Sequence, residues 1–237
     1  MQIPQQKLFK SPLVLAAIAS LAACQVASAA LSVTASVGGG PLPNTAKLTF
    51  DGLPLGSGGG YAGAGVTVSF TPNAQVVSGS VENQYAQPYF SGLNDVGFGN
   101  AAAGPDGTRY LTTGRTGDNG SITFTFDKDH TYLGLVWGST DDYNTLTFYD
   151  SANNVIGSVI PGTTTGMPNA GGAQGINGTY YVNITSDTAF RKVVATSGEF
   201  AFEMDNFAVV PEPSTYIAGG LALLPLLLGL RSRLAKK

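Results

Sequence analysis

The sequence predicts an all-β protein whose central part is a single antiparallel two-sheet β-sandwich, jelly-roll-like in class. Short runs with apolar residues at alternate positions recur between residues 31 and 209, and helical periodicity is absent there. Segments rich in Gly, Ser, Thr and Asn separate these runs, which are themselves rich in aromatic and β-branched residues. About 180 residues carrying roughly ten short strands are typical of one sandwich domain.

The first half of this domain is expected to hold four strands and two loops. Alternating apolar positions predict the strands over residues 31–37, 46–50, 66–70 and 75–81. Residues 51–60, DGLPLGSGGG, have the composition of a loop. Residues 82–106 form a much longer polar stretch with scattered aromatic residues, and a loop of this length has a functional role or packs against the sheet as a lid.

The second half contains the clearest strand patterns. Residues 121–126 place Ile122, Phe124 and Phe126 on one face, and a further strand is expected over residues 132–137. The charged residues 127–130, which include His130, are predicted to form the turn between these two strands. Further strands are expected over residues 144–149, 155–160, 179–185 and 190–195.

The last expected strand, residues 199–209, changes phase in the middle. Its apolar residues stand at even positions up to Met204 and at odd positions from Phe207 onward, which predicts a bulge at Asp205–Asn206. Carboxylate and amide oxygens at such a bulge could join loop carbonyls around a Ca²⁺ ion. The alternative interpretation is a bulge in which Asp205 only accepts backbone hydrogen bonds.

A second candidate site is the connection after residue 137, where aromatic and polar side chains cluster. As a ligand surface, Trp137 or Tyr143 would stack on sugar rings while Asp141, Asp142 and Asn144 bond hydroxyl groups. The alternative is that Trp137 belongs to the core and that the following residues form a turn whose short polar side chains cap backbone amides. The spacing of Trp137 from the apolar residues 133 and 135 favours the core.

Charge and residue content exclude several functional classes. Residues 30–210 hold 14 of the 15 acidic residues and six of the 12 basic residues, so their net charge is near −8, which disfavours nucleic-acid binding. His130 is the only histidine, which excludes a zinc site with two imidazoles, and no G-x-S-x-G elbow is present. We therefore expect no enzyme, although a carboxylate pair for glycoside hydrolysis stays open.

The first 29 residues have the three regions of a secretory signal peptide. Lys7 and Lys10 precede an apolar run over residues 13–23, and Ala27–Ala29 (Ala-Ser-Ala) is a cleavage site for signal peptidase. The alternative is that residues 21–24, Leu-Ala-Ala-Cys, form a lipobox in which Cys24 becomes lipidated. Cys24 is the only cysteine, so no intrachain disulfide can form.

Residues 210–237 combine a proline-rich motif, an apolar run and a basic terminus. The uncharged run 216–230 is shorter than the hydrocarbon core of a membrane, and extended back to Pro213 it is just long enough for a short transmembrane helix. The basic residues would hold the end of this helix at the cytoplasmic side. This end resembles the sorting signal of PEP-CTERM proteins, in which a membrane-embedded exosortase is thought to cleave near the motif. The alternative is a plain C-terminal anchor. The motif is Pro211, Glu212 and Pro213, and the basic stop is Arg231, Arg233, Lys236 and Lys237.

Two further stretches, residues 137–144 (WGSTDDYN) and 202–209 (FEMDNFAV), resemble a group of exosortase-dependent surface proteins. That resemblance implies a sandwich fold and a cell-surface location, but no established activity. We expect a domain that is exported, anchored transiently in the inner membrane and then released to the surface. Its expected role is a structural or adhesive component of an extracellular polysaccharide or biofilm matrix. The alternatives are a carbohydrate-binding module that could depend on Ca²⁺ and, third, a glycoside hydrolase.

Overall fold

The computed structural model describes residues 30–99, 103–113 and 120–211. The signal peptide expected over residues 1–29, and the sorting segment from Glu212 to the terminus, lie outside these ranges. Within the described ranges no helix has the length and apolar character needed to cross a membrane. The elements are β1 (Leu31–Ser36), β2 (Ala46–Leu48), β3 (Gly60–Gly63), β4 (Val66–Phe70), β5 (Ala74–Val77), β6 (Tyr89–Phe90), β7 (Gly104–Pro105), β8 (Tyr110–Thr113), β9 (Ser121–Gly138), β10 (Asn144–Tyr149), β11 (Val155–Val159), η1 (Gly175–Asn177), β12 (Tyr180–Ser197) and β13 (Phe202–Pro211).

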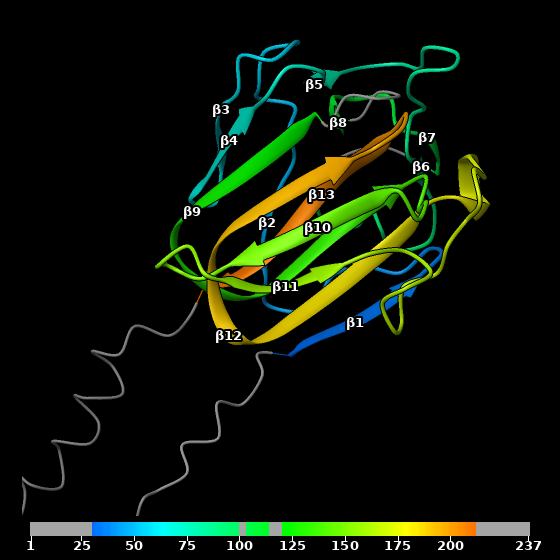
Figure 1. Cartoon of the computed structure of the whole chain (residues 1–237). Coiled ribbons are helices and arrows are strands. Elements are labelled where there is room, and N and C mark those ends of the chain that lie inside the picture. The colour runs from blue at the N-terminus through cyan, green and yellow to red at the C-terminus, as the bar shows by residue number, and fades with distance from the viewer. Residues whose placement is uncertain (1–29, 100–102, 114–119, 212–237) are drawn as a thin grey trace, which may run out of the picture.

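The fold is built around two long antiparallel strands, β9 and β12, of 18 residues each. They pair with each other from Trp137–Tyr180 to Ser121–Thr196, with irregularities only near His130 and Phe190. In Figure 1 both strands bend at the same edge of the molecule. The turn predicted over residues 127–130 is therefore wrong, because these residues continue β9, and the strands expected over 179–185 and 190–195 are likewise one continuous strand.

Because β9 and β12 bend, each contributes to two layers. In the first layer the strands lie in the order β1, the first half of β12, the second half of β9, and β13, and β2 and β8 flank β13 on its far side. In the second layer the order is β11, β10, the second half of β12, the first half of β9, β4 and β3. The result is the expected all-β antiparallel, sandwich-like fold (Figure 1).

Apolar side chains from both layers fill the space between them. The rings of Phe50, Phe124 and Phe207 contact one another with centroids 4.7–6.1 Å apart. Near the bend, His130 lies against Phe126 and Phe190 and is 1% exposed, so it is a core residue and not part of a charged surface turn. Burying these large side chains is the main source of the fold's stability, since the chain has no disulfide.

The outer face of the first layer is covered by residues 78–99 and 103–109, which we call the covering segment. Its Phe90 and Phe98 pack against Val136 and Tyr181, which point away from the central core. The long polar stretch expected over residues 82–106 thus packs against the sheet, one of the two roles that its length indicated. Polar residues of β13 are buried beneath this cover, among them Glu203, Asp205 and Asn206.

Strand β13 connects the two ends of the sandwich. It starts at Phe202, beside the ends of β9 and β12, and runs to Pro211, which pairs with His130 at the bend. The bulge predicted at Asp205–Asn206 is confirmed, because the register shifts between Asp205 and Ala208 and Asn206 has a φ of 52°. We call the end near Phe202 the loop pole and the end near His130 the bend pole.

Both ends of the described domain leave from the bend pole. Leu31 pairs with Ser186 on one side of the β9–β12 pair, and Pro211 pairs with His130 on the other side. Three strand spacings, about 14 Å, therefore separate the start of β1 from the end of β13. In Figure 1 these two ends lie at the lower left, and the loop pole lies at the upper right.

Candidate functional site

A cavity of about 480 Å³ opens at the loop pole. Four stretches of chain line it: the start of the covering segment, the loop after β9, the loop before η1, and the connection from β12 into β13. Because these stretches meet only through the fold of β9, β12 and β13, no local sequence motif marks the cavity. The lining residues are Ser80, Val81, Glu82, Asn83, Gln84, Tyr85, Ala86, Ser139, Asp141, Tyr143, Gly172, Gln174, Glu199, Phe200, Ala201 and Glu203.

The Tyr143 side chain is held in place at the wall of this cavity. Its hydroxyl lies 2.8 Å from Oδ2 of Asp141 and 3.1 Å from the backbone oxygen of Phe200, two acceptors for its proton. Oδ1 of Asp141 in turn accepts the backbone N–H of Gly172 at 2.5 Å. Burial and the neighbouring Asp141 carboxyl raise the pKa of Tyr143, so its hydroxyl stays protonated in the physiological range.

Glu203 forms the floor of the cavity from β13 and is 2% exposed. Its Oε1 accepts the backbone N–H of Ala86 at 2.8 Å, and no hydrogen-bond partner for Oε2 lies among the described residues. Burial, with a smaller contribution from the charge of Asp141, raises the pKa of Glu203 to about 8. At neutral pH this carboxyl is therefore mainly neutral and can donate a hydrogen bond as well as accept one.

The cavity combines aromatic surface with polar groups and has an acidic character. Tyr85, Tyr143 and Phe200 are half-buried, so part of each ring remains accessible. Gln84 and Gln174 add amide groups at the exposed rim, where Glu82 and Glu199 also lie. None of the described lining residues is Lys, Arg or His. Ligand sites commonly have this mixture of aromatic walls and a few fixed polar groups.

The structure separates the five residues of the sequence-predicted ligand cluster. Asp141 and Tyr143 line the cavity, whereas Asp142 is exposed and outside it. Trp137 is 0% exposed and stacks on Phe202 with ring centroids 4.1 Å apart, so it belongs to the core, as its spacing favoured. Asn144 is also buried and donates to the backbone oxygens of Ser139 and Ala201, which fixes the shape of the loop.

The second predicted cluster, Asp205–Asn206, lies under the covering segment rather than at the surface. Both residues are 0% exposed, and Asn206 donates from Nδ2 to the backbone oxygen of Asn94 at 3.1 Å. Asp106 of the covering segment is the carboxyl that interacts most strongly with Asp205. No sequence pattern marks Asp106 as a partner of Asp205, because only the fold brings residues 106 and 205 together.

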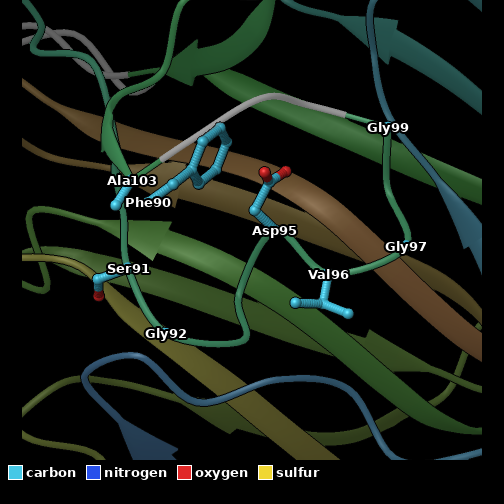
Figure 2. A pocket seen from close by; sticks show the side chains of 8 residues that line it. All are labelled: Phe90, Ser91, Gly92, Asp95, Val96, Gly97, Gly99 and Ala103. Atoms are coloured by element: carbon cyan, nitrogen blue, oxygen red, sulfur yellow. The ribbon is translucent and has the colours of Figure 1, made fainter.

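A second cavity, of about 430 Å³, lies within the covering segment, whose own residues line it (Figure 2). The ring of Phe90 and the carboxylate of Asp95 border the same space, and Val96 and Ser91 lie farther round the wall. Two of its lining residues, Gly99 and Ala103, flank residues 100–102, which lie outside the described part of the chain. We therefore assign no ligand to this cavity.

No protein-family model matches the chain, and no curated protein matches it in sequence. Among solved structures, it is similar to the enzymatically active domain of tailspike protein 4 of bacteriophage CBA120, with 14% identity and a TM-score of 0.30, over 62% of this chain and 20% of that chain. It is also similar to the carbohydrate-binding module CBM6cm-2 of Cellvibrio mixtus lichenase 5A, seen with cellotriose, with 12% identity and a TM-score of 0.30, over 71% of this chain and 98% of that chain. The chain thus spans about a fifth of the tailspike chain. Neither likeness is close enough to define a family or a ligand for this protein.

Proposed function

We propose that this protein is an exported surface domain that binds a saccharide in the cavity at the loop pole. The observation that carries the proposal is the convergence there of accessible aromatic rings with the fixed hydroxyl of Tyr143 and the buried carboxyl of Glu203. Saccharides present hydroxyl groups and apolar ring faces. The hydroxyl and carboxyl groups of the cavity can hydrogen-bond the former, and its aromatic rings can pack against the latter. In this proposal the binding site is carried by a jelly-roll-like sandwich, the fold class that the sequence predicts.

The charge of the cavity selects the class of saccharide. Glu82, Asp141 and Glu199 lie in its wall or rim, and no basic side chain of the described residues lines it. An acidic glycan would bring its carboxylates next to these groups without a counter-ion, which is electrostatically unfavourable. The ligand we propose is therefore a neutral or amine-bearing polysaccharide.

We propose binding without turnover. Glycoside hydrolysis needs a carboxylate that can act as base or nucleophile opposite a protonated acid. Glu203 has the burial expected of an acid, but both oxygens of Asp141 already take part in hydrogen bonds, to Tyr143 and Gly172. The remaining acidic residues, Glu82 and Glu199, are exposed at the rim.

The proposed cellular role is adhesion within an extracellular polysaccharide matrix. The N-terminal segment would direct export through signal peptidase, and the Pro211–Pro213 motif would direct processing by an exosortase. Since β13 runs for roughly 30 Å from the loop pole to Pro211, a domain tethered by its C-terminal end would hold the cavity away from the membrane. That orientation suits a module which captures a polymer outside the cell.

The test is co-sedimentation of the purified full-length chain with three insoluble polysaccharides of different charge: cellulose, chitosan and cross-linked alginate. We expect binding to the neutral or the amine-bearing polymer and none to the acidic one. Tyr143→Phe removes the fixed hydroxyl and should weaken binding about tenfold, as expected for the loss of one hydrogen bond in a ligand site. The melting temperature should change little.

Asp142→Asn is the matched control, because it neutralises an exposed acid next to Tyr143 that does not line the cavity. It should bind like the wild type. Equal weakening by both changes, or binding to none of the three polymers, would count against the proposal. Release of reducing sugar from a bound polymer would show that the protein hydrolyses the polysaccharide and does not only bind it.

A further inference from the structure

The region where β13 meets the covering segment contains two acidic side chains that are completely shielded from solvent. Asp205 lies on β13, on the face opposite the core residue Met204, and Asp106 lies on the covering segment. Both are 0% exposed. Burial and, next, the charge of the Asp106 carboxyl raise the pKa of Asp205, so the two carboxyl groups are close neighbours.

Three of their four carboxylate oxygens have no hydrogen-bond donor among the described residues. These are both oxygens of Asp205 and Oδ2 of Asp106. The backbone N–H of Asn206 is near Asp205 but does not form a hydrogen bond of normal geometry with it. The fourth oxygen, Oδ1 of Asp106, accepts the backbone N–H and the hydroxyl of Thr108 at 2.8 and 2.5 Å. Buried polar atoms are rarely left in this state unless a water molecule, an ion or a functional role accounts for them.

Among the residues that the structure describes, no positive side chain compensates this pair. Arg109 is the basic residue nearest to Asp106 in sequence, but its guanidinium donates to the backbone oxygens of Asp51 and Leu53. The carboxyl of Asp51 adds further repulsion to both aspartates. Two like charges in a buried site without a cation are strongly unfavourable, so the site needs either a shared proton or a bound metal ion.

We propose that Asp106 and Asp205 bind a Ca²⁺ ion that fastens the covering segment to the last strand. The donors are carboxylate oxygens, which Ca²⁺ prefers, and no imidazole or thiolate of the described residues lies with them. Within the described residues no three acidic or histidine side chains surround one point, so the remaining ligands would be neutral oxygens or water, as is common for Ca²⁺.

The ion would order the segment that forms one wall of the saccharide cavity. Gln87 donates from Nε2 to the backbone oxygen of Asp106, and the N–H of Asp106 donates to the backbone oxygen of Pro88. Residues 80–86, which line the cavity, directly precede these contacts. The Ca²⁺ proposal does not depend on saccharide binding, because its test uses the metal alone.

The test measures the melting temperature of the purified full-length chain in EDTA and then with saturating CaCl₂ or MgCl₂. We expect Ca²⁺ to raise the melting temperature by about 5–10 °C and Mg²⁺ to raise it less. Titration calorimetry with CaCl₂ should give one site per chain. Absence of a Ca²⁺ response in both measurements would overturn the proposal, and stabilisation by acid alone would then identify a shared proton.

Two neutral variants make the test specific. Asp205→Asn and Asp106→Asn each remove one of the like charges, so they should melt at the same temperature as the wild type in EDTA or higher, and both should lose the Ca²⁺ response. Glu203→Gln is the matched control, since it neutralises another buried carboxyl on β13 and should keep the response. A Ca²⁺ response that persists in both aspartate variants would place the metal elsewhere and overturn the assignment.

Discussion

The imidazole of His130 is buried where β9 bends, with ring centroids 4.9 Å from Phe126 and 6.0 Å from Phe190. Both ring nitrogens lack a hydrogen-bond partner of normal geometry among the described residues. Burial is the largest influence on this group and lowers its pKa below the usual value, because the charged form loses its hydration. His130 is therefore a neutral core residue at physiological pH.

This burial predicts a pH dependence of stability. Below pH 6.5 the unfolded chain binds a proton at His130 that the folded chain does not, so the contribution of His130 to the free energy of unfolding should fall as the pH falls toward the folded pKa. The raised pKa of Glu203 contributes with the opposite sign in this range, so the effect of His130 is measured as the difference between the wild type and a variant without the imidazole. The slope from this one group is at most about 1.4 kcal/mol per pH unit. His130→Phe should remove that slope between pH 7 and 5, as measured by urea unfolding.

The exposed Lys128, two residues away, supplies the control for this measurement. Lys128→Gln changes the local charge but not the number of protons bound near pH 6, so it should keep the wild-type slope. If the free energies of unfolding of His130→Phe and the wild type changed in parallel between pH 7 and 5, His130 would not be a titrating group that affects stability.

At the scale of elements, the sequence predicted most strands but not how two of them continue. The polar residues 127–130 have the composition of a turn, yet β9 and β12 keep the same pairing register on both sides of the bend. Periodicity describes which face a residue takes, and it holds no information about whether a short polar stretch reverses the chain. The bulge on β13 was predictable because it changes that face between Met204 and Phe207.

The candidate site was less predictable than the strands. Alternation placed Glu203 and Asp205 opposite the core residues Phe202 and Met204, but it could not show that another segment covers that outer face. The contact between Ala86 and Glu203 joins residues 117 positions apart, and the sequence near Glu203 carries no trace of it. Only Asp141 and Tyr143 of the predicted ligand cluster line the cavity, because the other three residues serve the core, the loop or the solvent-exposed surface.

The bulge itself gives a prediction for β13. Asn206 has a φ of 52°, a conformation that asparagine and glycine tolerate and β-branched residues do not. Asn206→Gly should destabilise the fold by about 1 kcal/mol, mainly through loss of the hydrogen bond to Asn94. Asn206→Val should cost roughly 1–2 kcal/mol more because it adds backbone strain. Denaturant unfolding in EDTA would measure both, and equal losses would contradict a left-handed backbone at this position.

At the scale of the whole molecule, the positions of the two poles bear on how the cavity would be presented on the cell surface. The described domain begins and ends at the bend pole, and the cavity lies at the loop pole. A tether attached after β13 would therefore not pass over the cavity. The acidic surface, with a net charge near −8 for residues 30–210, is also compatible with a domain that stays soluble beside a polymer matrix.

The extent of β13 sets a limit on where processing can occur. Pro211 pairs with His130 at the end of the strand, so cleavage before Pro211 would shorten β13 and uncover buried residues such as Val209. We therefore expect the surface form to retain residues up to at least Pro211 and to lack the apolar run 216–230. Intact-mass spectrometry of the protein from the cell surface and from the membrane fraction measures both limits.

A variant of the motif tests whether it directs this processing. Glu212→Ala should leave the full-length tail in the membrane fraction, whereas Glu82→Ala, which neutralises an exposed acid on the covering segment, should be processed normally. A surface form that still carried residues 216–237 would show that the tail is a plain anchor and that the motif is not used for release.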